Sequence, residues 1–132
     1  MADNGVAERT FDPHGEIAYC MGLIVGEGSF TGTPTVLALS VRLHVSDPLP
    51  LLDLQRVFGG TIYGLYSHGG RNYRMWLLRG SDLLDALPYF DRWLPPSRKR
   101  EQFLTWRSRH AAYFEHLGWF HVLRSWDALA DT

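Results

Sequence analysis

The nine residues GLIVGEGSF (22–30) place Glu27 at the end of an apolar run, between two glycines. The run continues a pattern that begins at Pro13, a residue suited to the first turn of a helix. Gly28 is expected to end that helix, which leaves Glu27 at its tip. One side of the helix carries apolar side chains at three- and four-residue spacing: Ile17, Cys20, Met21, Ile24 and Val25.

Gly22 and Gly26 lie four residues apart on another stripe of the same helix. A glycine inside a helix costs about 1 kcal/mol relative to alanine. Such a stripe is easiest to explain where a second backbone approaches closely. A membrane helix would also show it, but this segment is too short to span a bilayer. We therefore expect the helix to pack against a partner helix.

Composition indicates a globular protein of one domain. The chain has 132 residues, of which 45% are apolar and 20% charged. A single cysteine, Cys20, excludes a disulfide framework and a four-cysteine zinc site. No apolar stretch has spanning length, and the first ten residues are too polar for a signal peptide. We expect a soluble cytoplasmic protein, bacterial or phage-encoded, with a flexible tail at 1–12 and one domain at 13–132.

The net charge of −1 hides an asymmetry along the chain. Residues 1–30 carry five acidic residues and one basic residue, whereas residues 71–109 carry nine basic and four acidic residues. A basic surface of this kind can contact a phosphate backbone although the whole chain is nearly neutral. The alternative is a solvated face without a partner. Lys99 is the single lysine among thirteen basic residues, which makes it conspicuous.

The remaining pattern predicts an α+β protein with the order α-β-β-α-β-β-α-α. SFTGTP (29–34) is expected to turn the chain, and TVLALSVRLHV (35–45) alternates as a strand. One face of this strand is wholly apolar, and the other becomes polar towards its end. A helix over 46–58, capped by Ser46 or Asp47, follows, with a buried stripe at Leu51, Leu54, Val57 and Phe58.

The second half of the chain predicts a hairpin and further helices. TIYGLYS (61–67) and YRMWLLR (73–79) pair across HGGRN (68–72). A helix over 81–94 is expected to be kinked or broken at Pro88. Another covers 98–117, and the last dozen residues form a short amphipathic helix. The expected architecture is a four-stranded antiparallel sheet backed by helices. Several aromatic residues at helical spacing are assigned to the core: Trp106, Tyr113, Phe114, Trp119, Phe120 and Trp126.

The opening stretch resembles the signature of a known family. CMGLIVGEG (20–28) is similar to the nine-residue motif of the LAGLIDADG homing endonucleases, although Cys20, Met21 and Val25 depart from the commonest residues. GSF (28–30), LLDLQRVFGGTIY (51–63), YRMWLLRG (73–80) and RKREQFLTW (98–106) follow in the family's order and at about its spacing. The resemblance covers residues 14–114 and implies an αββαββα fold with a saddle-shaped sheet.

The resemblance also implies a homodimer and a metal site. With one motif per chain, the signature helix would pack against that of a second copy through Tyr19, Gly22, Leu23 and Gly26. Two copies of Glu27, with Gly26, would then hold Mg²⁺ against the scissile phosphates. The family often places a lysine at the start of the late helix, which nominates Lys99, or Arg98 if the alignment slips by one. His44 would order water near the metal, unless it is a structural histidine.

The strands of the sheet would read the DNA sequence. Ser40 and Arg42 on one strand, with Tyr63, Arg74 and Trp76 on the hairpin, are the candidate contacts. A slip of one residue would instead turn Tyr73, Met75 and Leu77 towards the DNA. Phosphate contacts are expected from His68 and Arg71 near the hairpin turn, and Arg98 is a further candidate for DNA binding.

Three functions fit these patterns. The first is a homodimeric, Mg²⁺-dependent endonuclease, intron-encoded, cutting double-stranded DNA at a long, nearly palindromic site. The second keeps the fold without cleavage, as an intron-RNA splicing cofactor or a DNA-binding regulator. The third is an interaction domain with no affinity for DNA, and the near-zero net charge suits it best. Because Glu27 is present, the first is favoured. The target and the host element (intron, intein or free-standing gene) are not encoded in these patterns.

Overall fold

The computed structural model describes residues 13–33, 36–44 and 47–116. The predicted tail at 1–12 and the predicted C-terminal helix, with Trp119, Phe120 and Trp126, lie outside these residues. The described elements follow in this order: α1 (Pro13–Glu27), β1 (Gly28–Thr33), β2 (Val36–His44), α2 (Leu49–Phe58), β3 (Thr61–His68), β4 (Arg71–Arg79), α3 (Gly80–Trp93) and α4 (Arg98–Arg109). No helix in this part of the chain is long and apolar enough to cross a membrane.

Helix α1 ends at Glu27, and strand β1 starts at the next residue. Gly28 makes this direct change possible, because a Cβ atom at this position would lie 2.5 Å from the Ile24 carbonyl oxygen. The predicted apolar side of the helix is buried at Ile17, Cys20, Met21 and Ile24. Burial and the charges of Asp53 and Glu16 raise the pKa of the Cys20 thiol to about 12, which keeps it protonated at neutral pH.

The sequence-based interpretation of residues 29–34 as a turn is wrong. Residues 28–33 form β1, which pairs antiparallel with β2 from Gly28 opposite Val41 to Thr33 opposite Val36. Side chains in this segment alternate between the two faces of the sheet. Phe30 packs against the rings of Phe103 and Trp106, whereas Ser29 and Thr31 are exposed. A six-residue strand with one apolar anchor has too little periodic signal to be recognised from the sequence.

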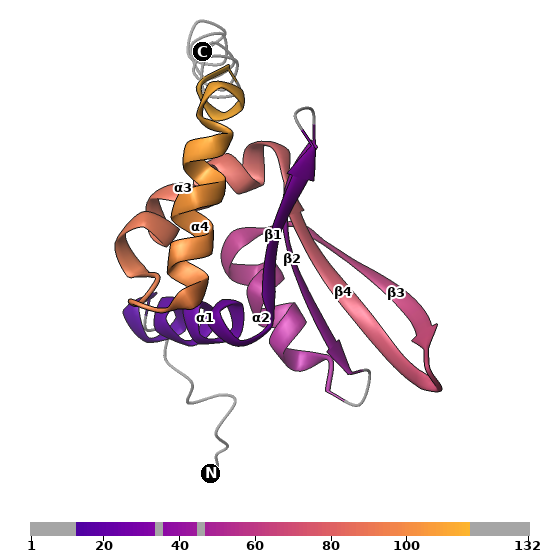
Figure 1. Cartoon of the computed structure of the whole chain (residues 1–132). Helices are drawn as coiled ribbons and strands as arrows, with labels where there is room; N and C mark the ends of the chain where they lie inside the picture. The colour runs from indigo at the N-terminus through magenta and orange to yellow at the C-terminus, as the bar shows by residue number, and fades with distance from the viewer. Residues whose placement is uncertain (1–12, 34–35, 45–46, 117–132) are drawn as a thin grey trace, which may run out of the picture.

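The four strands form one antiparallel sheet in the order β1-β2-β4-β3. The helices gather on one side of it, and its other face is left uncovered (Figure 1). The predicted α+β class and helix-backed antiparallel sheet are confirmed. The predicted helix was kinked or broken at Pro88; α3 continues through this residue, so it is not broken there. The N-cap position of α2 is Pro48 and has no side-chain cap, although the Asp47 carboxylate just before it accepts a hydrogen bond from the Leu49 amide at 3.3 Å.

The covered face of the sheet carries the core. Val41 pairs opposite Trp76 and Leu39 opposite Leu78, and all four side chains are buried. The Trp76 indole donates a hydrogen bond to the Gly59 carbonyl oxygen at 2.8 Å. The helices complete this core with Leu51, Leu54, Leu83, Phe90, Phe103 and Trp106.

Helix α4 packs against the edge strand β1. Its N-terminus is capped by Ser97, whose hydroxyl accepts from the Arg100 amide at 3.1 Å. Trp106 donates through its indole nitrogen to the Thr31 carbonyl oxygen at 3.1 Å, and Lys99 donates to the Gly28 carbonyl oxygen at 2.6 Å. These two side chains thus form hydrogen bonds with backbone carbonyl groups of the edge strand β1. Without them, these carbonyl groups could pair with a strand of another chain.

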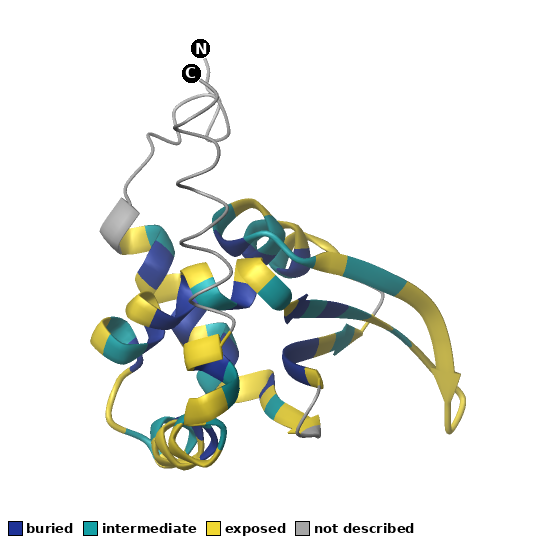
Figure 2. Cartoon of the chain, turned by 90° about the horizontal axis from the view of Figure 1, so that it is seen from above, coloured by how far each residue is buried: buried dark blue, intermediate teal, exposed yellow. Residues whose placement is uncertain are grey.

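The β3–β4 hairpin turns at Gly69 and Gly70, whose φ angles of 59° and 78° are of the left-handed kind that a two-residue turn requires. The hairpin projects from the body of the molecule and is exposed along its outer part (Figure 2). The pairing is irregular between Tyr63 and Tyr66.

Candidate functional site

The uncovered face of the sheet is polar, aromatic and basic. Residues directly opposite each other on neighbouring strands share a face, so the register defines its rows. Across the sheet these rows are Ser29, Ser40, Leu77 and Thr61, then Arg42, Met75 and Tyr63, then His44, Tyr73 and Tyr66. Arg42 and His44 are exposed, and Tyr63 and Tyr73 are partly so. Ser40 also lies on this face, but its side chain is only 8% exposed and so lies beneath the accessible surface.

The assignment of Trp76 and Arg74 to this face is wrong. Trp76 is fully buried opposite Val41, and Arg74 shares its side of the sheet opposite Leu43. The alternative register, with Tyr73, Met75 and Leu77 on the uncovered face, agrees with the structure. Both alternating sets on β4 contain apolar residues, so the sequence pattern did not discriminate between them. The largest side chain, Trp76, takes the core position because its indole also finds a backbone acceptor there.

Glu27 lines a cleft of about 640 Å³ that includes residues of the uncovered face. The cleft is lined by Glu27, Arg42, Leu43, His44, His68, Arg71, Asn72 and Tyr73. It therefore brings together one predicted catalytic acid, the predicted histidine and three predicted DNA contacts from α1, β2 and the hairpin. The Glu27 side chain is exposed, and its carboxylate makes no ion pair or hydrogen bond within the described residues.

Lys99 lies next to this acid. Its ammonium group donates to the carbonyl oxygen of Gly28, the residue that follows Glu27, at 2.6 Å. Arg98 instead lines a separate hollow with Phe30, Gln102 and Arg109. Of the two bases that the sequence left open, Lys99 is thus the one whose side chain reaches the end of α1.

In the described part of the chain, no group of three or more histidine, cysteine, aspartate or glutamate side chains is placed to hold a metal ion. One chain therefore offers Glu27 and, in the same last helical turn, the Gly26 backbone. The last carbonyl groups of a helix have no partner within it. This donor set is hard oxygen, which suits Mg²⁺ when phosphate oxygens and water supply the other ligands.

No model of a known protein family matches the sequence, and no curated protein sequence does either. Solved structures do match. The I-SmaMI LAGLIDADG homing endonuclease bound to cleaved DNA superposes with a TM-score of 0.62 at 22% identity, over 82% of this chain and 39% of that one. The homing endonuclease I-TnaI superposes with a TM-score of 0.62 at 19% identity, over 81% of this chain and 78% of that one. The chain has the LAGLIDADG endonuclease fold.

The chain spans about two fifths of the I-SmaMI chain. I-SmaMI has also been solved with its uncleaved DNA target in the presence of calcium ions, and that structure matches with a TM-score of 0.57 at 22% identity over 82% of this chain. The sequence-based recognition of the LAGLIDADG motif at Cys20–Gly28 thus agrees with the fold found by structure comparison.

The glycine stripe of this LAGLIDADG helix is open. A Cβ atom added to Gly22 or Gly26 would meet nothing within 4 Å, and both residues are exposed on the side away from the core. Tyr19 is 42% exposed beside them, and Leu23 is half-buried. Burial, together with the charge of Asp53, raises the pKa of the Tyr19 hydroxyl, so it is a neutral hydrogen-bonding group at neutral pH.

Sequence reasoning missed five residues of the uncovered face: Ser29, Thr31, Thr61, Tyr66 and Arg79. Ser29 and Thr31 were assigned to a turn. Arg79 shares a face with Tyr73 and Leu77, which the sequence placed towards the DNA only in the alternative register. Strict alternation from Tyr63 places Tyr66 on the opposite face. The irregular pairing between these two tyrosines returns Tyr66 to the same side as Tyr73.

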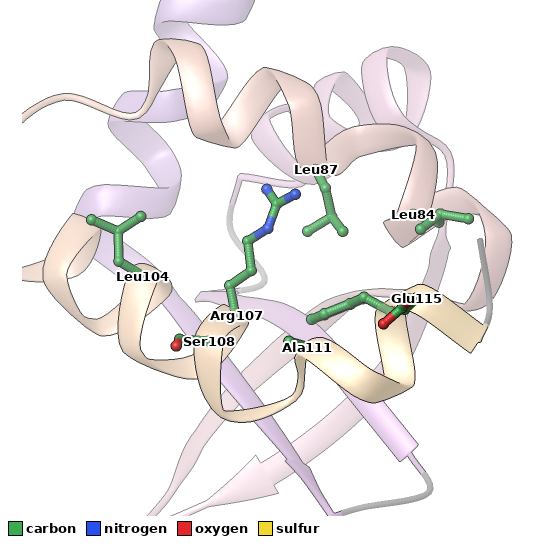
Figure 3. Close-up of a pocket in the computed structure, with 8 residues that line it drawn as sticks. Leu84, Leu87, Leu104, Arg107, Ser108, Ala111 and Glu115 are labelled. Carbon is green, nitrogen blue, oxygen red and sulfur yellow. The ribbon is translucent and has the colours of Figure 1, made fainter. Parts of the chain in front are cut away.

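Another hollow lies between α3 and α4, on the helical side of the molecule (Figure 3). Its volume is about 490 Å³, and its lining is largely apolar, with Leu84, Leu87, Leu104, Ala111 and Phe114. Arg107 in its wall pairs with Asp91. Because none of the predicted site residues lines this hollow, it is not part of the candidate site.

Proposed function

We propose that this protein is a divalent-metal-dependent endonuclease that acts on double-stranded DNA as a homodimer. The observation that carries the proposal is the position of Glu27 at the end of the signature helix. Its carboxylate is exposed, has no partner among the described residues, and lies one residue from the backbone oxygen that Lys99 contacts. Glu27 lines a cleft that is also lined by Arg42 and Arg71. A carboxylate that has no partner in the described part of the chain, in a cleft also lined by cationic side chains, suits a metal and a phosphate better than a structural role.

The second subunit would pack on the glycine stripe of α1. Open space at Gly22 and Gly26 lets another helix backbone approach to a short distance, with Tyr19 and Leu23 at the edges of the contact. An isologous contact of this kind brings the same residue of each copy to the symmetry axis. The two Glu27 carboxylates would then lie close together at the ends of the paired helices.

Glu27 of each chain, with the Gly26 backbone, would hold Mg²⁺. The bound metal would lower the pKa of a water molecule and offset negative charge on the leaving oxygen. The chain's own contribution is the placement of charge. Lys99, whose ammonium group donates to the carbonyl oxygen of Gly28 next to Glu27, would stabilise charge that develops on the phosphate during cleavage. His44, exposed in the same cleft, is a candidate for ordering water.

DNA would lie along the uncovered face of the sheet. Arg42 and Tyr63, which share the uncovered face, would contact base edges, whereas His68 and Arg71 at the end of the hairpin would contact phosphates. A twofold-symmetric protein recognises two equivalent half-sites, which implies a long and nearly palindromic target. The DNA-bound I-SmaMI structures, which share this fold, support this choice of partner.

The test is Glu27→Gln, which keeps the size of the side chain and removes its charge. A target is first selected from randomised double-stranded DNA, and cleavage is measured with Mg²⁺ beside a gel-shift assay in Ca²⁺. We expect Glu27→Gln to dimerise and bind the target, to lose Ca²⁺ binding in calorimetry, and to cleave several orders of magnitude more slowly. Lys99→Met should slow cleavage less and retain metal binding.

Glu16→Gln is the matched control, since Glu16 lies on the same helix but pairs with Arg56 at 2.6 Å. This variant should cleave at the wild-type rate. A Glu27→Gln protein that also cleaves at that rate would exclude Glu27 from the chemistry. A wild-type protein that binds its target and never cleaves it would instead point to a binding protein, such as a splicing cofactor or a regulator.

A further inference from the structure

Arg42 on the uncovered face lies against an aromatic pair. Its guanidinium carbon is 5.8 Å from the centre of the Tyr73 ring. The Tyr73 ring is in turn 5.3 Å from that of Tyr66, with the two planes tilted by 31°. The three side chains come from three different strands, β2, β4 and β3, and they share one face of the sheet.

The neighbouring acid does not engage this arginine. Glu27 lines the same cleft, yet Arg42 makes no ion pair within the described residues. The five N–H donors of its guanidinium therefore remain available to a ligand. An arginine held over an aromatic face gains a modest attraction when exposed. That contact also reduces the number of conformations that must be given up on binding.

We propose that Tyr73, supported by Tyr66, is a positioning residue that holds Arg42 for bidentate recognition of one guanine in the major groove. Guanine presents two acceptors, O6 and N7, that match two parallel N–H donors of a guanidinium. This inference rests on the proposed binding of double-stranded DNA along the sheet, and it does not depend on cleavage. It assigns one position of each half-site to Arg42 and makes the ring of Tyr73 responsible for the strength of that preference.

Two arginines of the β3–β4 hairpin, Arg74 and Arg71, lack this arrangement. Arg74 lies on the opposite side of the sheet, where its side chain packs against Gly64. Arg71 lies beside the turn, two residues from Tyr73, and among described residues no aromatic ring is stacked with it. Arg74 is therefore a matched control: an exposed arginine on the same strand as Tyr73 that faces away from the proposed DNA path.

The experiment is selection of binding sites from double-stranded DNA with randomised positions, in Ca²⁺, with sequencing of the bound fraction. Arg42→Ala should lose the guanine preference at one position per half-site by roughly 5- to 150-fold. Tyr73→Leu should weaken it at that same position by roughly 2- to 5-fold, and Tyr73→Phe should retain it because the ring remains. The double variant Arg42→Ala/Tyr73→Leu should lose no more than Arg42→Ala alone.

Arg74→Ala should leave every position unchanged. The inference is overturned if Tyr73→Leu keeps the full guanine preference, if it weakens all positions equally, or if Tyr73→Phe behaves like Tyr73→Leu. Should Tyr73→Leu fail to fold, as seen by circular dichroism, Tyr66→Leu on the exposed hairpin provides the same test with a smaller effect at the same position. A wild-type protein that selects no DNA would refute the proposed function itself, which separates the two failures.

Discussion

Replacing Trp76 by phenylalanine tests the register of β4 through protein stability. Trp76 is fully buried, and its indole donates to the Gly59 carbonyl oxygen at 2.8 Å. Phenylalanine keeps an aromatic ring near Phe58 but removes the donor and leaves the carbonyl unpaired, at a cost of about 1–3 kcal/mol. The smaller ring also leaves a cavity, so the free energy of unfolding should fall by about 2–4 kcal/mol in all.

Urea unfolding followed by circular dichroism measures this change without relying on tryptophan fluorescence. With a slope of about 2 kcal/mol per molar urea, the midpoint should fall by roughly 1–2 M. Arg74→Ala is the control: its side chain is exposed on the same side of the strand, so its effect should stay within about 0.5 kcal/mol. A Trp76→Phe protein with the wild-type midpoint, or one with altered base preference, would contradict both the burial of Trp76 and the pairing register of β4.

The remaining predictions concern assembly, salt and pH. Gly22→Leu should convert a dimer seen by light scattering into a folded monomer, because the added side chain meets only the second copy, whereas Gly28→Ala should destabilise the fold itself through its 2.5 Å contact with Ile24; a monomeric wild type would exclude the helix-to-helix dimer. Arg71→Ala should weaken binding of all DNA sequences alike and lower the slope of log K against log salt by about one, and an unchanged slope would show that Arg71 contacts no phosphate. The raised pKa of Cys20, about 12 against 9.0 when unfolded, means that the unfolded chain releases its proton first, so stability should decline from about pH 9 towards pH 12 in wild type and less in a Cys20→Ala variant.

Much of the architecture is present in local sequence. The spacing of Ile17, Cys20, Met21 and Ile24 defines which side of α1 is buried, and Gly28 defines where the helix ends. The same local pattern places an acid at that end. These features depend on residues within one or two helical turns, so a period of 3.6 and a terminal glycine are sufficient to predict them.

The faces of the hairpin could not be derived in that way. On β4 the set with Tyr73 and Met75 and the set with Arg74 and Trp76 are both mixtures of apolar and polar residues. Contacts with residues distant in the sequence decide which set is buried: Trp76 lies opposite Val41 of β2, and its indole donates a hydrogen bond to the Gly59 carbonyl oxygen. A side-chain period of two carries no information about which set is buried when both sets can be, and only the strand partners resolve it.

The sequence by itself determined the acid, the glycine stripe and the order of the elements apart from β1, because each of these features depends on neighbouring residues. Only the tertiary structure decided that Lys99, rather than Arg98, reaches the end of α1, and that Arg42 lies over Tyr73. In both cases the contact joins segments distant in the chain, 71 residues apart for Lys99 and Gly28. Whether such side chains meet depends on how α4 and the strands pack around a shared core, a geometry to which all of the buried residues contribute together.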